Sequence, residues 1–304
     1  MQALQKFSFL KTMLLTWLRI CFKIFHPGYV PRRSFTAKRR QRFRFFILSL
    51  PEPNKNKTIM DSIKNRRTIR KYKQDDVPAN LLNGLLEEAF RAPTMGNMQL
   101  YSVIITRDKA MKERLAPAHF HQPMLMEAPV VLTFCADFNR FVKWCRQRKA
   151  EPGYDNLLSF MNASIDTIML TQNFCTLAEA AGLGTCFLGT TIYNPDQIIE
   201  VLNLPELVIP LATITVGYPD EYPPQTDRLP LEGIIHEEQY HDYSPADIDR
   251  IYAYKESLPE NKHFVEINHT ETLAQIFTDI RYTKEGNETM SEVLKKTLRK
   301  QKFD

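Results

Sequence analysis

The stretch from Leu157 to Ala181 constrains the fold more than any other part of the sequence, because it is apolar on nearly every side. Its large apolar side chains are Phe160, Met161, Ile165, Ile168, Met169, Phe174 and Leu177. Gly182 follows in the position that commonly ends a helix, so the stretch is predicted to form one long helix. A helix without a polar face has to be buried, either in a core or between subunits.

Shorter patterns predict further helices on both sides of this one. Apolar residues recur at helical spacing in the segment 79–91, behind a helix-compatible proline. Asn194 and Pro195 resemble a cap followed by the first residue of a helix over 195–203. Asp61 or Ser62 is predicted to cap a short helix that runs into the basic segment 66–70.

Three short runs bounded by breakers are predicted strands: Tyr101–Thr106, Val130–Cys135 and Leu211–Gly217, the last of them central. Helices and strands are mixed without a regular βαβ period, and there is no internal repeat. The predicted fold class is therefore α+β, in one domain that occupies residues 60–304.

Charge divides the chain into two unlike parts. Residues 1–59 carry 13 Lys and Arg against one acid, whereas residues 60–304 carry 27 against 34, so a net charge of +12 precedes one of −7. The apolar run between Lys11 and Arg19 is seven residues long, far short of the roughly 20 that a membrane span needs. It also lacks the apolar core and cleavage site of a secretory signal.

Two interpretations of residues 1–59 remain. In the first, the segment is not catalytic: it is a disordered leader, or an artefact of where translation is taken to begin, with Met60 as the natural start. In the second, it is a basic amphipathic segment that contacts a membrane surface or nucleic acid. The segment 51–57 has the composition of a linker. Five widely spaced cysteines without a C-x-x-C favour neither a disulfide framework nor a zinc site, and a reducing cytoplasm fits best.

Three segments have the composition of ligand-binding loops. Segment 66–70 places three guanidiniums and a hydroxyl where they can match phosphate oxygens, although a solvated basic turn has the same pattern. Segment 92–99 carries a glycine and two side-chain amides that could hydrogen-bond to the edge of a heterocyclic ring. The same residues also occur in an ordinary turn. The glycines of 182–190 follow a helix and lead into a strand, which is the reverse of a Rossmann loop, so they favour close backbone approach to a flat ligand.

Other chemistries lack their usual motifs. The sequence has no P-loop, no G-x-S-x-G and no H-E-x-x-H. His119 and His121 form an H-x-H pair without a convincing third ligand, so a metal site is not expected. Asp137 and Asp166 lack partners that would identify an acid/base pair.

Taken in order, these segments resemble the nitroreductase family, in its branch of NADPH-dependent, oxygen-insensitive nitroreductases and flavin reductases. The resemblance runs from about Met60 to His241. It is carried by four blocks, which are the segment from Arg66 to Tyr72, the loop through Asn97 and Gln99, the segment from Phe134 to Arg140, and the segment from Asp227 to Pro230. It implies a mostly antiparallel sheet flanked by helices, and a homodimer with FMN bound at the subunit interface.

The resemblance also implies roles for individual residues. Arg66, Thr68, Arg70 and Arg228 are expected to hold the FMN phosphate, and Arg67 to contact the flavin or its ribityl chain. Contacts with the ribityl chain or ring are expected from Thr94, Asn97, Gln99 and Gln122. Leu188, Gly189 and Thr190 are expected over the ring, with backbone N–H groups near N5. Three positions depart from the family pattern: Arg66 replaces a frequent histidine, Thr190 a second glycine, and Thr226 a frequent lysine.

The implied activity is a ping-pong oxidoreductase in the cytoplasm. NADPH or NADH reduces FMN, and a nitroaromatic, quinone or free flavin then accepts the electrons, so the cofactor performs the chemistry and no protein nucleophile is expected. One alternative on the same fold is a reductive dehalogenase or flavin-fragmenting enzyme. Another is a protein that holds flavin without turnover, or that residues 1–59 recruit to a membrane or nucleic acid.

Overall fold

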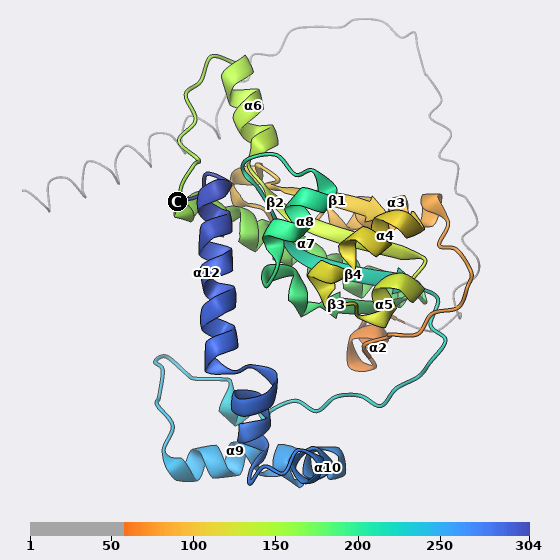
Figure 1. Ribbon diagram of the computed structural model, residues 1–304, viewed down its shortest axis with the longest axis vertical. Helices are drawn as coiled ribbons and strands as arrows, with labels where there is room; N and C mark the ends of the chain where they lie inside the picture. The colour runs from red at the N-terminus through yellow and green to blue at the C-terminus, as the bar shows by residue number, and fades with distance from the viewer. Residues whose placement is uncertain (1–57) are drawn as a thin grey trace, which may run out of the picture. The chain divides into compact units, whose positions relative to one another are not determined.

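The structure is a computed structural model that describes residues 58–304 (Figure 1). The expectations for residues 1–57, including the basic segment and the linker, lie outside these residues. In chain order the elements are α2 (Ile59–Lys64), α3 (Ala79–Ala89), η1 (Met95–Asn97), β1 (Tyr101–Thr106), α4 (Lys109–Leu115), η2 (Pro117–His119), α5 (Pro123–Glu127), β2 (Val130–Asp137), α6 (Asn139–Gln147), α7 (Leu157–Ala180), β3 (Gly184–Leu188), η3 (Gly189–Ile192), α8 (Pro195–Leu202), β4 (Val208–Gly217), η4 (Leu231–Gly233), α9 (Pro245–Ser257), α10 (Pro259–Ile267), α11 (Leu273–Gln275), η5 (Ile276–Arg281) and α12 (Lys284–Lys300).

Four antiparallel strands form one sheet in the order β1-β2-β4-β3. The three predicted strands are confirmed, and β4 is central, as expected. Every residue of β2 and β4 is buried, so these strands are largely apolar along their whole length and do not alternate between apolar and exposed polar residues. The edge strands are β1 and β3, and each leaves one side of its backbone available to other segments.

Helices cover both faces of the sheet, which explains why its central strands are fully buried. Alternate residues of β2 face opposite ways, so Leu132 packs with α3 and α7 while Val131 packs with α4, α5 and α8. Phe174 of α7 lies in the first of these two cores, and Ile198 of α8 lies in the second. The fold is thus a helix–sheet–helix arrangement of the α+β class, as predicted.

The long apolar helix is confirmed as α7, and it has two unlike faces. One face is buried against the sheet and includes Phe160 and Phe174. The other face exposes large apolar side chains to solvent: Leu157, Leu158, Met161, Ile165 and Ile168. Gly182 ends the helix with a φ of +85°, and Leu183 N donates to Ala178 O at 2.9 Å.

The helix before the basic segment differs from the prediction that Asp61 or Ser62 caps it. Its cap is Thr58, whose Oγ1 accepts a hydrogen bond from Asp61 N at 3.1 Å, while the Asp61 carboxylate accepts one from Thr58 N at 2.9 Å. This reciprocal capping box makes Asp61 the third residue of the helix. The helix ends at Lys64, so the basic segment 66–70 is not helical.

Two other helices are confirmed with shorter ends. α3 ends at Ala89 rather than residue 91, and α8 ends at Leu202 rather than residue 203. Asn194 precedes α8 but does not cap it through its side chain. Its Nδ2 instead donates to Ala118 O at 3.0 Å, so the amide braces η2.

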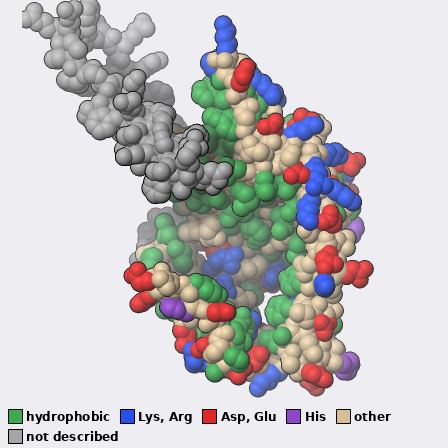
Figure 2. All heavy atoms as spheres, turned by 90° about the vertical axis from the view of Figure 1, so that its left-hand side faces the viewer, with side chains coloured by type: hydrophobic (Ala, Val, Ile, Leu, Met, Phe, Trp, Pro, Cys, Tyr) green, Lys and Arg blue, Asp and Glu red, His purple; other side chains and the backbone are tan. Residues whose placement is uncertain are grey.

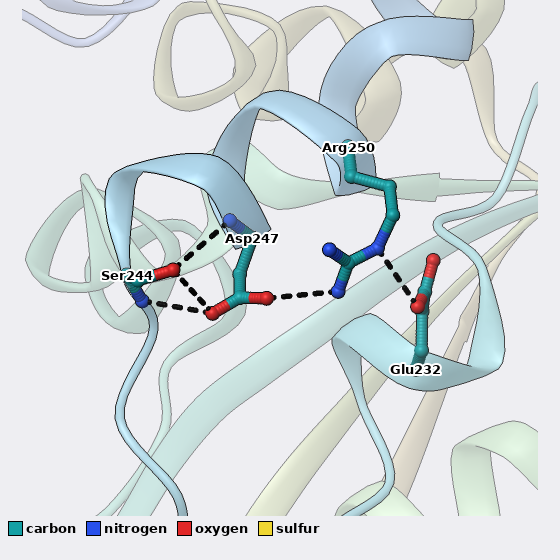
Figure 3. A network of polar contacts seen from close by, with 4 residues as sticks. All are labelled: Glu232, Ser244, Asp247 and Arg250. Carbon is teal, nitrogen blue, oxygen red and sulfur yellow. Dashed lines mark hydrogen bonds and ion pairs between the residues drawn. The ribbon is translucent and has the colours of Figure 1, made fainter.

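Residues 230–283 form an excursion that we call the arm, and Figure 1 shows its helices α9 and α10 lying apart from the sheet. A polar network links α9 to η4 within the arm (Figure 3). Arg250 Nη2 donates to Asp247 Oδ1 at 2.8 Å and Arg250 Nε to Glu232 Oε2 at 3.1 Å, while Asp247 also forms a capping box with Ser244. The arm therefore holds its own local structure.

The chain returns from the arm through α12, which contacts α8. The penultimate residue, Phe303, is fully buried and lies against Phe160 of α7 with ring centroids 5.6 Å apart. Leu207 N donates to Gln301 O at 3.0 Å, which joins the end of α12 to the start of β4. Among residues 58–304, no helix is both long enough and apolar enough to cross a bilayer.

Candidate functional site

The basic segment 66–70 lies beside the edge strand β3. Ile69 N donates to Thr185 O at 3.0 Å, and the buried Ile69 side chain packs where Gly184 leaves no room for a Cβ. An added Cβ on Gly184 would lie 2.7 Å from Ile69. The glycine and the isoleucine thus fix the register of this segment, with Arg66, Arg67 and Thr68 half-buried and Arg70 exposed.

A second segment, 218–225, runs along the first and precedes the late arginine in the chain. Arg67 Nε donates to Pro223 O at 2.8 Å, and Gln225 Nε2 donates to Lys64 O at 2.7 Å. Arg228 follows three residues after Gln225, and its guanidinium is exposed and bonded locally, to Thr226 Oγ1 at 2.9 Å. Its neighbour Asp227 forms an ion pair with Lys255 of the arm at 2.9 Å, and no hydrogen bond joins Arg228 to segment 66–70 among the described residues.

Two carboxylates lie among these arginines. Glu179, at the end of α7, forms an ion pair with Arg66 at 3.5 Å and accepts a hydrogen bond from Thr185 Oγ1 at 2.7 Å. Glu221 accepts hydrogen bonds from the backbone of Arg70 at 2.6 Å and of Lys71 at 3.2 Å. Their positions beside the guanidiniums hold the basic segment in place. A hollow of about 80 Å³ opens here between Arg66, Arg67 and Gly182.

The other end of β3 leads into the turn Leu188–Thr190. An added Cβ on Gly189 would meet no atom within 4 Å, so the space beside this glycine is open. Thr190 is buried, and its Oγ1 is hydrogen-bonded to His119 Nδ1 at 2.8 Å. The Thr190 side chain is thus turned into the protein and leaves the space beside Gly189 free.

Gln122 lies on the turn after η2, next to this second end. Its N–H donates to His119 O at 3.1 Å, and its Oε1 is buried without a hydrogen-bond partner among the described residues. A buried acceptor without a partner costs stability unless a bound group supplies a donor. Gln122 is therefore suited to a ligand that carries an N–H.

The amide loop 92–99 is held by a buried acid of α7. Asp166 is fully buried and accepts hydrogen bonds from Met95 N at 2.8 Å and Leu100 N at 3.2 Å. The loop backbone has positive φ at Gly96, Asn97 and Gln99. Asn97 and Gln99 expose their side chains to solvent, and Thr94 is half-buried.

The amide loop and the arginines lie at opposite edges of the sheet. The loop leads into β1, whereas the basic segment lies against β3, and the central strands separate these two edges. Three inter-strand spacings of about 4.8 Å make this separation roughly 14 Å. One chain thus carries two candidate half-sites, the arginines of segment 66–70 with the Gly189 turn on one edge and the amide loop on the other.

The thiols of the core are not suited to nucleophilic catalysis. Burial raises the pKa of Cys175 to about 12, and it also raises the pKa values of Cys135 and Cys186. All three therefore stay protonated at neutral pH. Groups of three or more His, Cys, Asp or Glu that could hold a metal ion do not occur within residues 58–304.

Comparison with known proteins places this geometry in a family. The family model described as the Nitroreductase family matches residues 63–218. A Bacillus subtilis (strain 168) protein named FMN reductase, NAD(P)H, is 32% identical over 205 residues, covering 66% of this chain and 82% of that protein. The chain belongs to the nitroreductase family.

Two further relatives agree with this nitroreductase assignment. The oxygen-insensitive NADPH nitroreductase of Salmonella typhimurium is 32% identical over 194 residues, covering 64% of this chain and 78% of that protein. The crystal structure of a Bacteroides fragilis NCTC 9343 protein named as an oxidoreductase has 67% identity and a TM-score of 0.80, and it covers 81% of this chain and 100% of its own.

Several residues of this candidate site were missed by sequence reasoning. Asp166 was noted without a partner, although an acid inside an otherwise apolar helix is itself a signal that it binds backbone N–H groups. Glu179 and Glu221 gave no sequence signal. His119 was considered as a metal ligand with His121, and the structure instead bonds it to Thr190.

Proposed function

We propose that this protein is an FMN-dependent NAD(P)H oxidoreductase that reduces small electron acceptors, such as a nitroaromatic, a quinone or free flavin. The observation that carries the proposal is the arrangement along β3, with guanidiniums at one end and the open Gly189 turn at the other. The names of the relatives, FMN reductase and NADPH nitroreductase, support the same reaction class. Reductive dehalogenation and flavin fragmentation remain alternatives on this fold.

The residues present fit FMN at both ends. The four steps of β3 span about 13 Å at about 3.3 Å each, which suits a ligand with a charged tail and a flat head. Arg66, Thr68, Arg70 and Arg228 would hold the phosphate, because guanidiniums match its oxygens in paired hydrogen bonds. Arg67 would contact the ribityl chain. Its guanidinium lies over the Tyr222 ring, with Cζ 5.4 Å from the centroid.

The ring end would be shaped by the Gly189 turn and Gln122. The open space beside Gly189 admits a flat ring without displacing a side chain, and the backbone of Leu188, Gly189 and Thr190 would supply N–H donors to its edge. The unpartnered Gln122 Oε1 would accept a hydrogen bond from a ring N–H. FMN, when bound, would supply the transfer of two electrons between nicotinamide donor and acceptor.

The chain's own residues would bind and orient rather than act as nucleophiles. Positive charge from the arginines would offset the phosphate, and preorganised N–H groups at the Gly189 turn would favour a negatively charged ring. NADPH or NADH would dock over the same ring without a Rossmann loop, since segment 182–190 follows a helix and enters a strand.

A homodimer would complete the site. The exposed apolar face of α7 is suited to a subunit interface, and the arm adds further exposed apolar side chains, including Leu231, Ile234 and Tyr254. Figure 2 shows hydrophobic side chains gathered on one face of the molecule rather than scattered singly. The second copy would bring its Thr94, Asn97 and Gln99 to the arginines of the first, which the single chain does not do.

A cytoplasmic location fits the four free cysteines of residues 58–304, which a reducing compartment preserves. Contact of residues 1–59 with a membrane surface would be a separate property of that segment. The core is expected to need neither a membrane nor a nucleic-acid partner.

The proposal is tested with the full chain, purified and given excess FMN. We expect one FMN bound per chain, a flavin absorption spectrum, and anaerobic bleaching of that spectrum by NADPH or NADH. Arg228→Ala is expected to lose FMN on gel filtration, because the phosphate loses a charge-assisted contact. Correctly folded wild-type protein that stays colourless in excess FMN would refute the proposal, and a coloured protein that neither nicotinamide bleaches would point to flavin binding without turnover.

A further inference from the structure

A buried hydrogen bond joins the turn after η2 to the Gly189 turn. His119 Nδ1 and Thr190 Oγ1 lie 2.8 Å apart, His119 is fully buried, and Thr190 is nearly so. Thr190 directly follows Gly189, so the bond acts one residue from the open space described above. The two residues come from segments 71 positions apart in the chain.

The direction of this bond depends on which imidazole nitrogen carries the proton. A threonine hydroxyl carries one proton to donate, and a neutral imidazole offers one bare nitrogen to accept it. If Thr190 donates to His119 Nδ1, the ring proton lies on Nε2, which has no partner among the described residues. Burial lowers the pKa of His119 to about 4, so the ring is neutral at physiological pH and can accept.

The turn that carries His119 is held in a strained conformation. Phe120 and His121 both have positive φ, of 51° and 52°, which is costly for residues with a side chain. His121 N donates to Ala116 O at 2.8 Å, and Asn194 Nδ2 braces the turn at Ala118 O. Strain of this kind persists only where surrounding contacts over-determine it, and such positions cluster at ligand sites.

The same turn ends in Gln122, whose Oε1 is buried without a partner among the described residues. His119 therefore connects two groups that face the candidate ring site, the Gly189 turn through Thr190 and Gln122 through the backbone bond from Gln122 N to His119 O. Movement of the backbone and ring of His119 would displace both groups together.

We propose that His119 is a positioning residue for the flavin site, whose neutral ring accepts the Thr190 hydroxyl and so fixes the Gly189 turn and Gln122 in one arrangement. The proposal rests on the proposed function and adds a residue to it. It also assigns a role to Thr190. Where the family often has a flexible glycine, the Thr190 hydroxyl holds the turn by a hydrogen bond to a buried residue.

The test compares Thr190→Val, which removes the hydroxyl, with Thr190→Ser, which keeps it. Thr190→Val is expected to weaken FMN binding to the full chain roughly fivefold, as the loss of one hydrogen bond predicts. Thr190→Ser is expected to bind within about twofold of wild type. Thr297→Val is a matched control, because it removes a buried hydroxyl that donates to Val293 O at 2.8 Å in α12. The control is expected to leave FMN affinity unchanged.

A double-mutant cycle distinguishes a specific bond from general damage. His119→Phe keeps an aromatic ring and removes the acceptor, so the double variant with Thr190→Val should bind FMN no more weakly than either single variant. Additive losses, or Thr190→Val that binds FMN as tightly as wild type, would overturn the proposal. Wild-type protein that fails to bind FMN would instead count against the proposed function.

A second readout does not depend on FMN. Nitrogen NMR of histidine-labelled protein without flavin should show His119 neutral with its proton on Nε2, and Thr190→Val should change the Nδ1 signal. A proton on Nδ1 in the wild type would overturn the proposal, even if the protein binds flavin tightly.

Discussion

Asp166 Oδ1 accepts a hydrogen bond from Met95 N at 2.8 Å, which ties the amide loop to the core helix α7. Because Asp166 is fully buried and its second oxygen accepts from Leu100 N, both carboxylate oxygens are used. Asp166→Asn would turn one acceptor into an N–H donor facing a backbone N–H. We expect a loss of about 1–3 kcal/mol in the free energy of unfolding, measured by urea denaturation, together with weaker FMN binding.

Asn162→Asp on the same helix serves as the control for this prediction, since it makes the reverse amide-to-acid change at a half-buried position. Asp166→Asn protein with wild-type stability and wild-type FMN affinity would show that the loop does not depend on this acid.

Gly189→Val should separate cofactor binding from folding. The structure leaves the space beside Gly189 open, so the chain itself accommodates the larger side chain, whereas a flat ring in that space would collide with it. We expect an unchanged melting temperature without flavin and at least a roughly tenfold loss of FMN affinity, measured by fluorescence titration. Gly153→Val is the control, because Gly153 also has open space around it but lies in the loop before α7. Equal FMN affinity in both variants would contradict this placement of the ring.

The free energy of unfolding should decrease as the pH is lowered, because His119 titrates. Burial lowers its pKa from 6.5 to about 4 in the folded protein, so the unfolded chain binds the additional proton first as the pH falls. The contribution of this histidine is fully present above pH 6.5 and is lost progressively as the pH falls towards about 4, by roughly 3 kcal/mol in total.

The measurement is urea unfolding of the flavin-free protein at pH 7.5 and pH 5.5. Between these two pH values, the free energy of unfolding of the wild type should decrease by about 1 kcal/mol more than that of His119→Phe, since the variant has no proton to gain at this position. An identical pH dependence in the two proteins would argue against a buried neutral ring.

Leu158→Glu should dissociate the proposed homodimer. Leu158 is 70% exposed on the apolar face of α7, so the change leaves the isolated chain intact but places an unpaired charge in a subunit interface. We expect dimerisation to weaken by roughly 100-fold or more in light scattering, with loss of FMN in parallel. Trp144→Glu, at an exposed position of α6, makes a similar change away from α7. A Leu158→Glu dimer that retains FMN would place the interface elsewhere.

Much of the fold could be predicted because its strands and long helix are strongly patterned. The runs that became β1, β2 and β4 are bounded by breakers, and the apolar α7 ends at a glycine that adopts positive φ. The predicted cap of α2 was wrong. Thr58, Asp61 and Ser62 are all of residue types that cap helices, and the local sequence does not determine which one is used.

The candidate site could be predicted in its parts but not in its arrangement. Composition indicated the arginines and the glycine turn, and both lie along β3. The position of the amide loop at the opposite edge depends on the strand order β1-β2-β4-β3, which periodicity does not encode. The contact between His119 and Thr190 depends on the same long-range pairing, so no local pattern reveals it.

The separation of the two half-sites has a genetic consequence. If each flavin takes its arginines from one copy and its amides from the other, a chain defective at Arg70 and a chain defective at Asn97 would each be inactive alone. Expressed together in one cell, the two variants would complement each other. In a heterodimer of the two, one of the two flavin sites would contain both an intact Arg70 and an intact Asn97.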